Sequence, residues 1–388
     1  MKSFTKEEFK QWLVGFIDAE GNFQVFMDRK YLRVMFRINL HIDDVEILYK
    51  IKEFLGVGKV VIGKTSATYI INNTADLINV LFPILDQYKL LTTKYLDYQD
   101  FCKVVNKLII NNSSVFTGSD LTWLENCIKN MNSGRDIINY ELIPNTSVTL
   151  FWLLGFIEGE GSFGFKNLVP YFQIGQNVRN THVLTAISKF LSSLSSEFKF
   201  SELSVSLKEN STLNKSTNVL VISYHNIDSL HDILAHLLIQ FPFQTRKGTD
   251  FYHWCIVLYM HKFGYIYLTE GRKLAVNIAS FVNKSRYSTS INKVNTPIID
   301  LSLFDTSLPV TLTPKMTHLE LSQNFAKTYK TRNVWVYNNN VLVKGSPFMS
   351  NADAAASVGL NRTTRIVARY LDTGKSYQER YEFTTKAK

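Results

Sequence analysis

The stretch "LVGFIDAEGNF" at residues 13–23 begins as an apolar helix and ends in two acids and a glycine. An acid at the C-terminus of a helix is unfavourable, because the aligned peptide dipoles leave partial negative charge there. The same pattern recurs as "LLGFIEGEGSF" at residues 153–163. The acids that close the two helices, Glu20 and Glu160, therefore require a chemical explanation.

The motif belongs to a longer internal repeat. Residues 35–55 parallel residues 171–191, and "YKLLTTKYLDY" parallels "FPFQTRKGTDF", which aligns Lys94 with Lys247. Each copy shows the patterns of a helix, two strands, a helix, two weaker strands and a helix. Because Glu160 follows Glu20 by 140 residues, the pattern indicates a duplicated domain rather than a solenoid repeat.

This organisation predicts an α+β protein with two related αββαββα halves. The first half spans residues 1–110, and a polar connector with one helix, "SDLTWLENCIKNM", spans 111–149. The second half spans 150–271. A second polar linker at 272–332, rich in Ser, Thr and Asn, then leads to a small module at 333–388.

Small residues four apart mark one stripe on each motif helix. Gly15 and Ala19 form the first stripe, and Gly155 and Gly159 form the second. A stripe of small side chains lets another helix backbone approach closely, and the best partner for one such helix is the other. We therefore expect the two helices to pack together on a pseudo-twofold axis.

That packing would bring Glu20 and Glu160 together at the base of the interface. Gly21 and Gly161 are expected to end the helices as C-cap residues. Two carboxylates at converging negative helix ends repel each other unless a cation lies between them. Carboxylate and carbonyl oxygens suit Mg²⁺, so the sequence predicts a divalent metal site. The alternative is that each acid is an ordinary solvated helix end.

The strands alternate cleanly between apolar and polar residues. At residues 31–40 the even positions are apolar and the odd positions are mostly polar, as in a half-buried strand. The polar face is either solvated or a nucleic-acid surface, since the major groove admits a two-stranded ribbon that reads bases through Arg, Asn and Gln. The candidate DNA-binding residues are Gln24, Tyr31, Arg33, Arg37, Asn39, Lys166, Tyr171 and Gln173.

Composition narrows the function. The chain has 388 residues and a formal net charge of +10, which favours an anionic partner such as nucleic acid. No apolar run is long enough to span a bilayer, so no membrane partner is expected. Cys102, Cys127 and Cys255 form neither a CxxC pair nor a zinc spacing and are predicted to be free thiols.

The beginning of the chain resembles neither a signal peptide nor a transit peptide. Asn, Ile, Lys, Phe and Tyr, which have AT-rich codons, are prominent and indicate an AT-rich genome such as an organellar one.

Over residues 8–270 the chain resembles a monomeric, double-motif LAGLIDADG homing endonuclease. The resemblance rests on "LVGFIDAEG", "LLGFIEGEG" and the repeated lysine segment. It implies sheets that form a saddle over the DNA major groove. It also implies cleavage of both strands across the minor groove, with short 3′ overhangs.

The resemblance also implies site residues. Glu20 and Glu160, helped by the backbone carbonyls of Ala19 and Gly159, would bind Mg²⁺, and Mn²⁺ or Ca²⁺ could occupy the same site. The remaining implied catalytic residues are Lys94, Lys247 and the water-orienting Gln176. The counterpart of Gln176 is Leu40, a departure that predicts two unequal sites.

Residues 333–388 read as a hairpin, "VWVYNNNVLV", followed by two helices. Ser350 or Asn351 caps a short Ala-rich helix that ends near Gly359, and "LNRTTRIVARYLDTG" forms a second helix ended by Gly374. This helix-turn-helix resembles the small DNA-binding domains appended to intron-encoded nucleases. A protein-interaction or structural tail is the alternative. The candidate contacts are Arg362, Thr363, Thr364, Arg365 and Arg369.

Together these features predict a monomeric, site-specific, double-stranded DNA endonuclease, encoded within an organellar intron and located in a fungal mitochondrion. A group I intron RNA maturase that binds its host intron RNA, with or without nuclease activity, is the rival. A DNA-binding protein without catalysis is a third reading. The retained acids Glu20 and Glu160 disfavour both alternatives.

Overall fold

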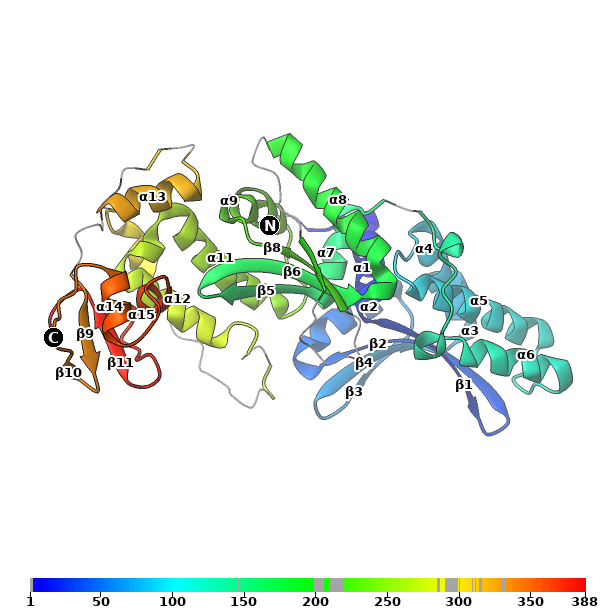
Figure 1. The fold of residues 1–388 in the computed structure, drawn as a ribbon. Helices are drawn as coiled ribbons and strands as arrows, with labels where there is room; N and C mark the ends of the chain where they lie inside the picture. Colours follow the sequence, from blue (N-terminus) through cyan, green and yellow to red (C-terminus); the bar gives the residue numbers. More distant parts are fainter. Residues whose placement is uncertain are drawn as a thin grey trace.

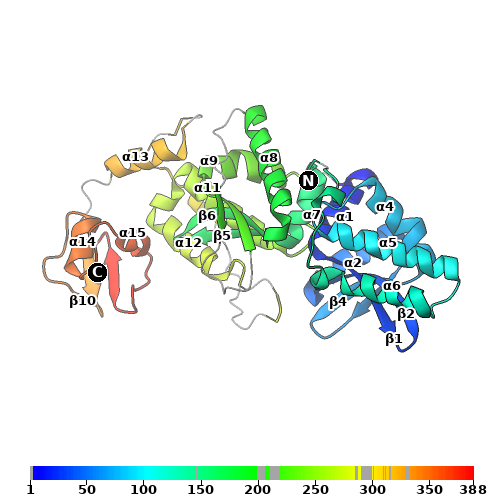
Figure 2. The ribbon, with the colours of Figure 1, turned by 45° about the vertical axis from the view of Figure 1, so that its right-hand side comes forward.

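The computed structural model describes residues 3–145, 147–198, 206–209, 219–284, 287–289, 299, 301–308, 310, 312–313, 316–328 and 333–388. The molecule is elongated, with the first half at one end, the second half in the middle and the C-terminal module at the other end (Figure 1). Helices α1 and α7 lie between the two halves (Figure 2). Each half contains one antiparallel sheet, so the predicted α+β class is confirmed.

The first half follows the predicted order of elements. It contains α1 (Lys6–Glu20), β1 (Gly21–Asp28), β2 (Tyr31–His41), η1 (Ile42–Asp44), α2 (Val45–Leu55), β3 (Lys59–Ile62), β4 (Ser66–Ile71), α3 (Thr74–Asp76), η2 (Leu77–Leu81), α4 (Phe82–Gln87) and α5 (Lys94–Asn111). The strand order is β1-β2-β4-β3.

The second half repeats this plan. It contains α7 (Leu150–Glu160), β5 (Gly161–Lys166), β6 (Val169–Asn177), η5 (Val178–Asn180), α8 (Thr181–Phe198), β7 (Ser206–Glu209), β8 (Val219–Tyr224), α9 (Ile227–Ser229), η6 (Leu230–Ala235), α10 (His236–Leu238) and α11 (Lys247–Phe263). Its strand order, β5-β6-β8-β7, is the same as in the first half.

The alternation of β2 follows the prediction. Leu32, Val34, Phe36 and Ile38 are buried against the helices, and the side chains between them face outward. Cross-strand pairing gives the correspondence between the halves. Gly21 pairs with Ile38, and Gly161 pairs with Ile174. Counting two residues on in each strand therefore makes Leu40 and Gln176 equivalent, as predicted.

Helices α1 and α7 pack at backbone distance. A Cβ atom on Gly15 would overlap the carbonyl oxygen of Trp152, and one on Gly155 would overlap that of Trp12. The glycine stripes therefore do what the sequence predicted, because only a residue without a side chain leaves room for the facing backbone.

Gly21 and Gly161 are the C-cap residues of α1 and α7, as predicted, but they do not adopt the left-handed conformation that is common at such caps. Gly21 has φ −71° and ψ 150°, and Gly161 has φ −73° and ψ 145°, which is extended backbone. Glycine is required there by crowding instead. A Cβ atom on Gly21 would lie 2.7 Å from the Cγ2 atom of Ile17, and the environment of Gly161 is similar.

The duplication is longer than the sequence suggested. Helix α6 (Gly118–Lys129) follows α5 just as α12 (Thr269–Phe281) follows α11. After α6, Asn132 has φ 54°, its backbone N–H donates to Asp97 at 3.0 Å, and its side-chain amide donates to the Phe23 carbonyl at 3.0 Å.

The second half repeats these contacts. After α12, Asn283 has φ 62°, its N–H donates to Asp250 at 3.1 Å, and its amide donates to the Phe163 carbonyl at 2.5 Å. The predicted boundaries at residues 110/111 and 271/272 therefore need correction, because one further helix and this returning Asn belong to each half.

Residues 272–332 were expected to be a polar linker with little core. The described part of this segment instead contains helices with buried apolar residues. Ile278 and Phe281 of α12 are buried with Ala275 in a second apolar core. Helix α13 (His318–Thr328) buries Leu321 and Phe325. The segment also contains η8 (Leu301–Asp305), and the remaining short elements, η3 (Asn132–Gly134), η4 (Tyr140–Leu142) and η7 (Tyr265–Tyr267), lie earlier in the chain. Within the described residues, no helix is long and apolar enough to cross a membrane.

The C-terminal module has its own core and a three-stranded sheet in the order β10-β9-β11. Its elements are β9 (Trp335–Asn338), β10 (Val341–Leu342), α14 (Asn351–Ser357), α15 (Ile366–Tyr370) and β11 (Tyr381–Thr384). Ser350 caps α14 by accepting a hydrogen bond from the Asp353 N–H at 3.1 Å, as predicted.

The second helix of the module is shorter than predicted. It begins at Ile366 and ends at Tyr370, well before Gly374. The Asn361 side chain accepts hydrogen bonds from the N–H and hydroxyl of Thr363 at 2.9 and 2.8 Å, which forms a local turn that competes with a helix. The predicted contacts Arg362, Thr363 and Thr364 therefore lie before the helix.

Candidate active site

The two motif acids lie at adjoining helix ends. A Cβ atom on Gly159 would be 3.0 Å from Oε1 of Glu20, so the Glu20 side chain reaches across the interface to the second repeat. Burial is the main cause that raises the pKa of Glu20 and of Glu160, and the Glu20 charge raises the pKa of Glu160 further. The predicted convergence of these two acids is thus present in the fold.

The two predicted lysines bind the helix ends beside the acids. Lys94 Nζ donates to the carbonyl oxygens of Ile17 at 2.9 Å and Ala19 at 3.3 Å. Lys247 Nζ donates to those of Gly159 at 2.9 Å and Gly161 at 2.5 Å. A cation there offsets the negative end of each helix dipole and adds a hydrogen-bond donor to carbonyls at the helix ends.

The environment of Lys94 also shows how polar the site is. Burial lowers the pKa of the Lys94 ammonium, while the charges of Asp18, Glu160 and Glu20 act in the opposite direction. The carbonyls of Ala19 and Gly159 each accept one lysine hydrogen bond. A carbonyl oxygen has two lone pairs, so both can still serve as ligands.

Gln176 makes the two halves unequal. Its side chain hydrogen-bonds the Glu160 carboxyl, which lowers the pKa of Glu160, and its Oε1 accepts from Asn180 Nδ2 at 2.8 Å. The equivalent Leu40 has no polar side-chain atom. Glu20 instead experiences the charge of Asp44, which raises the pKa of Glu20.

The first acid of each motif, to which the sequence analysis gave no role, anchors the segment before the lysine. Buried Asp18 accepts hydrogen bonds from the N–H of Leu91 at 2.7 Å and the hydroxyl of Thr92 at 2.6 Å. It also accepts from Trp152 Nε1 at 2.9 Å, across the interface. Thr92 Oγ1 in turn accepts from the N–H of Lys94 at 3.2 Å.

Glu158 does the same in the second half. It accepts from the N–H of Gln244 at 2.5 Å and the hydroxyl of Thr245 at 2.5 Å, and Thr245 Oγ1 accepts from the Lys247 N–H at 3.3 Å. Burial raises the pKa of Glu158 to about 7 despite these donors. The signal in the sequence was the acid two positions before each terminal Glu.

Each half also caps the lysine helix of the other half. Asp44 accepts from the Arg246 N–H at 2.7 Å, and Asn180 accepts from the Thr93 N–H at 2.9 Å. Both acceptors close the short turn that follows the second strand of their half. Their repeated position was visible in the sequence, but their partners in the other half were not. We name this pair of contacts the reciprocal caps.

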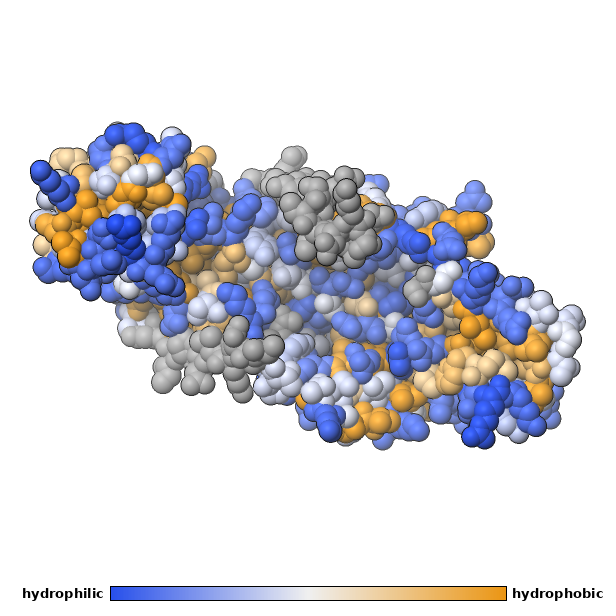
Figure 3. All heavy atoms as spheres, turned by 60° about the horizontal axis from the view of Figure 1, so that its bottom comes forward, coloured by the Kyte–Doolittle hydropathy of each residue, from blue (hydrophilic) through white to orange (hydrophobic). Residues whose placement is uncertain are grey.

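The predicted DNA-facing residues lie on the outward sides of the two sheets. Arg33 is 55% exposed and lies 3.6 Å from the Asp28 carboxylate, and Asn39 accepts from the Thr68 hydroxyl at 2.8 Å. Tyr31 and Lys166 are exposed, and the half-buried members are Gln24, Arg37, Tyr171 and Gln173. Hydrophilic residues cover much of the middle of the face that Figure 3 turns forward.

The DNA-binding residues predicted in the C-terminal module differ in their surroundings. Arg362 forms an ion pair with Asp353. Arg365 precedes α15, and Arg369 within that helix has a buried Nε atom without a hydrogen-bond partner among the described residues. These residues therefore do not form one exposed recognition face.

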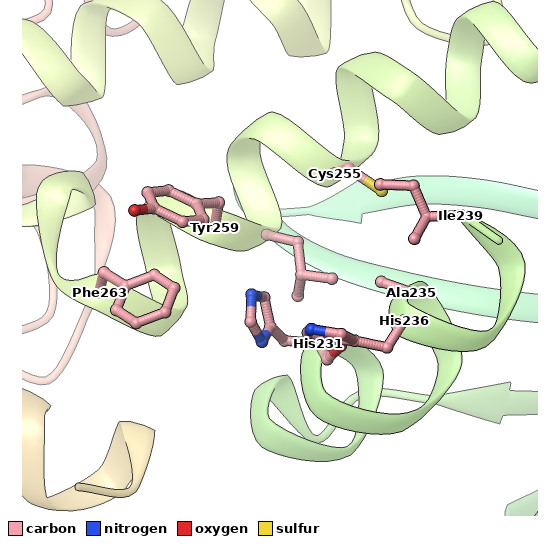
Figure 4. Close-up of a pocket in the computed structure, with 8 residues that line it drawn as sticks. His231, Ala235, His236, Ile239, Cys255, Tyr259 and Phe263 are labelled. Atoms are coloured by element: carbon pink, nitrogen blue, oxygen red, sulfur yellow. The ribbon is translucent and has the colours of Figure 1, made fainter. Parts of the chain in front are cut away.

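A separate apolar cavity of about 390 Å³ lies between η6 and α11 (Figure 4). His231, His236 and Cys255 are among its lining residues. Within the described residues no cluster of three or more His, Cys, Asp or Glu side chains is arranged as a metal site. This cavity is distinct from the paired acids.

Comparison with known proteins supports the family resemblance found in the sequence. Residues 13–105 match the family model described as LAGLIDADG endonuclease. The first repeat is thus similar to a LAGLIDADG domain. The resemblance to this family that the sequence predicted is therefore supported over the first repeat.

Curated relatives of this chain come from fungi. An uncharacterized mitochondrial protein, RF1, of Saccharomyces cerevisiae is 27% identical over 97% of the chain and 81% of its own length. A probable intron-encoded endonuclease, Cox1-I1b, of Schizosaccharomyces pombe is 31% identical over 48% of the chain. The chain spans half the length of that second relative.

Solved LAGLIDADG structures share the fold of both repeats. The meganuclease I-CpaMI bound to uncleaved DNA aligns with a TM-score of 0.59 at 23% identity, over 73% of this chain and all of its own. I-GzeII in complex with its DNA target aligns with a TM-score of 0.58 at 23% identity, over 70% of this chain and 97% of its own. I-SmaMI bound to an uncleaved DNA target in the presence of calcium ions aligns with a TM-score of 0.56 at 23% identity, over 71% of this chain and 98% of its own.

Proposed function

We propose that this chain is a site-specific endonuclease that hydrolyses both strands of a DNA duplex and leaves short 3′ overhangs. The observation that carries the proposal is the convergence of Glu20 and Glu160, one from each repeat, at the base of the α1–α7 interface. Cutting a duplex requires one reactive centre for each strand, and the two repeats offer one each.

The residues present suit a divalent cation. The two carboxylates raise each other's energy, and the pKa of Glu160 is raised by the Glu20 charge, so a cation between them would relieve the repulsion. Glu20 and Glu160, with the carbonyls of Ala19 and Gly159, would hold Mg²⁺, and Mn²⁺ or Ca²⁺ suits the same oxygen ligands. When bound, the metal would supply charge relief at the phosphate and at the leaving oxygen.

The protein's own groups have separate tasks in this proposal. Lys94 and Lys247 neutralise the helix ends and provide positive charge beside the scissile phosphates. Gln176 orients Glu160 and a water molecule in the second half. Asp18 and Glu158 act as positioning residues, because they fix the segments from which the two lysines begin.

The polar faces of the two sheets would bind the duplex, and the monomer would suffice because both repeats are in one chain. We infer that the C-terminal module is an accessory contact with the same DNA.

The fungal mitochondrial and intron-encoded relatives support an origin within a mitochondrial intron. A role as a group I intron maturase would use the same basic charge, but it would assign no task to the paired acids.

The test is cleavage of a library of candidate intron-insertion sites by the purified chain with Mg²⁺. Glu20→Gln and Glu160→Gln should each abolish double-strand cleavage and leave affinity for the selected site nearly unchanged. Glu125→Gln, on the exposed side of α6, is the matched control and should cut normally. Normal double-strand cutting by either motif variant would refute the assignment of the acids.

A further inference from the structure

A polar cavity of about 400 Å³ lies where the C-terminal module meets the second half. Its lining includes the hairpin between β5 and β6, the C-terminal end of α12 and Arg369 of α15. In both ribbon views α15 lies beside this end of the second half (Figures 1 and 2). Thr269 of α12 and Asp372, just after α15, are hydrogen-bonded at 3.3 Å and join the two parts.

Arg369 has no counter-ion among the described residues that line this cavity. Its Nε atom is buried and has no hydrogen-bond partner among the described residues. None of the described lining residues is acidic. Two other arginines of the module do have partners, since Arg362 pairs with Asp353 and Arg380 donates to Asn338 at 2.8 Å. A buried polar group without a partner is costly, and an anion in the cavity would remove that cost.

The cavity adjoins the predicted DNA-facing side of the second sheet. Gly164 and Lys166 are two residues apart on β5 and therefore lie on the same face of the sheet. A Cβ atom on Gly164 would lie 2.5 Å from the Tyr171 ring, so that ring covers Gly164. Gly164 and Tyr171 line the cavity, together with Asn167 of the hairpin and exposed Lys284 at the rim. A duplex lying along this sheet face would carry its backbone past the opening.

We propose that this cavity binds one phosphate group of the DNA backbone, outside the segment that faces the paired acids, with Arg369 as the charged ligand and Lys284 at its rim. The planar guanidinium can donate two parallel hydrogen bonds to phosphate oxygens. The proposal rests on the DNA-binding function argued above. It makes the junction of module and second half, rather than a recognition helix alone, the point where the module contacts DNA.

The test is the salt dependence of duplex binding by the full-length chain. A fluorescein-labelled random-sequence duplex of about 40 base pairs would be titrated between ~50 and ~200 mM KCl, where log K falls linearly with log salt. Losing one phosphate contact in Arg369→Gln should reduce the magnitude of the slope by about 0.9. Arg369→Lys, which keeps the charge, should retain the wild-type slope. Arg380→Gln is the matched control in the same module and should also retain it.

Lys284→Gln provides an independent variant if Arg369→Gln fails to fold, and it too should flatten the slope. A wild-type slope in folded Arg369→Gln, or equal flattening in Arg380→Gln, would overturn the proposal. So would an effect seen only with an RNA duplex of the same length. A salt-independent or absent interaction of the wild-type chain with DNA would instead refute the proposed function itself.

A free anion is the other source of the same chemistry. Melting of the wild type and Arg369→Gln would be compared in inorganic phosphate and in chloride at equal ionic strength. Stabilisation of the wild type alone by phosphate, with an unchanged DNA slope in Arg369→Gln, would assign the cavity to a soluble phosphate and reject the DNA contact.

Discussion

Gly155 of α7 faces the carbonyl oxygen of Trp12 in α1, and a Cβ atom on Gly155 would overlap that oxygen. Gly15 of α1 makes the equivalent contact, with the carbonyl oxygen of Trp152 as its partner. The level at which the two helices cross, and therefore the meeting of Glu20 and Glu160, depends on these contacts.

Gly155→Ala should therefore destabilise the fold. Neither backbone can move without shifting its own half, so we expect a loss of about 3 kcal/mol in the free energy of unfolding, typical of overpacking. Gly175→Ala is the control, because a Cβ atom there would meet its nearest neighbour at 3.6 Å. It should change stability by no more than about 0.5 kcal/mol. Equal denaturation midpoints for the two variants would show that the helices can separate freely.

Glu158 should make stability depend on pH. Its pKa is about 7 in the folded chain and 4.5 when exposed, so between these values the folded state holds a proton that the unfolded state has lost. Stability from this group is then greatest at acidic pH and falls as the pH rises toward 7. The total decrease is about 3 kcal/mol. Melting curves from pH 4.5 to 7.5 should show that Glu158→Gln lacks this decrease, while Glu125→Gln keeps it. Parallel curves for Glu158→Gln and the wild type would contradict the assignment.

Gln176 should make one strand easier to cut at low pH. Its hydrogen bond lowers the pKa of Glu160, so Gln176→Leu should raise that pKa and leave less carboxylate at a given acidic pH. The acidic limb of the pH–rate profile for the strand that depends on Glu160 should move to higher pH. Nicking rates on a duplex with each strand separately labelled measure this, and the other strand serves as the internal control. A shift of equal size on both strands would argue against a local effect.

The outward face of β2 should contribute to DNA affinity and preference. Alanine at Arg33, Arg37 or Asn39 should cost about 1–3 kcal/mol where the side chain reads a base, and should relax preference at one base pair. Lys103→Ala, which removes an exposed lysine paired with Asp100 on α5, should have no such effect. Binding measured on single-base variants of the selected site provides the comparison. Unchanged affinity, salt slope and preference in all three variants would make this face ordinary solvent surface.

The sequence predicted those parts of the fold that depend on local pattern and repetition. The period-two alternation from Tyr31 to Leu40 gave the buried face of β2, and the small residues at Gly15 and Gly155 gave the helix pair. Lys94 and Lys247 were found because the same short segment occurs twice. Their hydrogen bonds to the carbonyls at the helix ends could not be predicted, because every residue has a backbone carbonyl and the sequence does not indicate which one accepts.

Other features depend on competition that a pattern does not show. The length of the second module helix was overestimated because the Asn361 side chain binds the Thr363 backbone in a turn, and the helix begins only after it, at Ile366. The predicted end of the second half fell at Gly271, inside α12, because the apolar residues of this helix, such as Ile278, are spaced among polar ones. The contact between Asp44 and Arg246 joins residues 202 positions apart, and no local signal connects them.

The reciprocal caps limit how this chain can be rearranged. Asp44 of the first half serves the lysine helix of the second, and Asn180 of the second half serves that of the first. Both caps accept a backbone N–H, so each would also fit a copy of its own half. A chimaera that exchanges one half for that of a relative should assemble when the incoming half brings an oxygen acceptor at this turn.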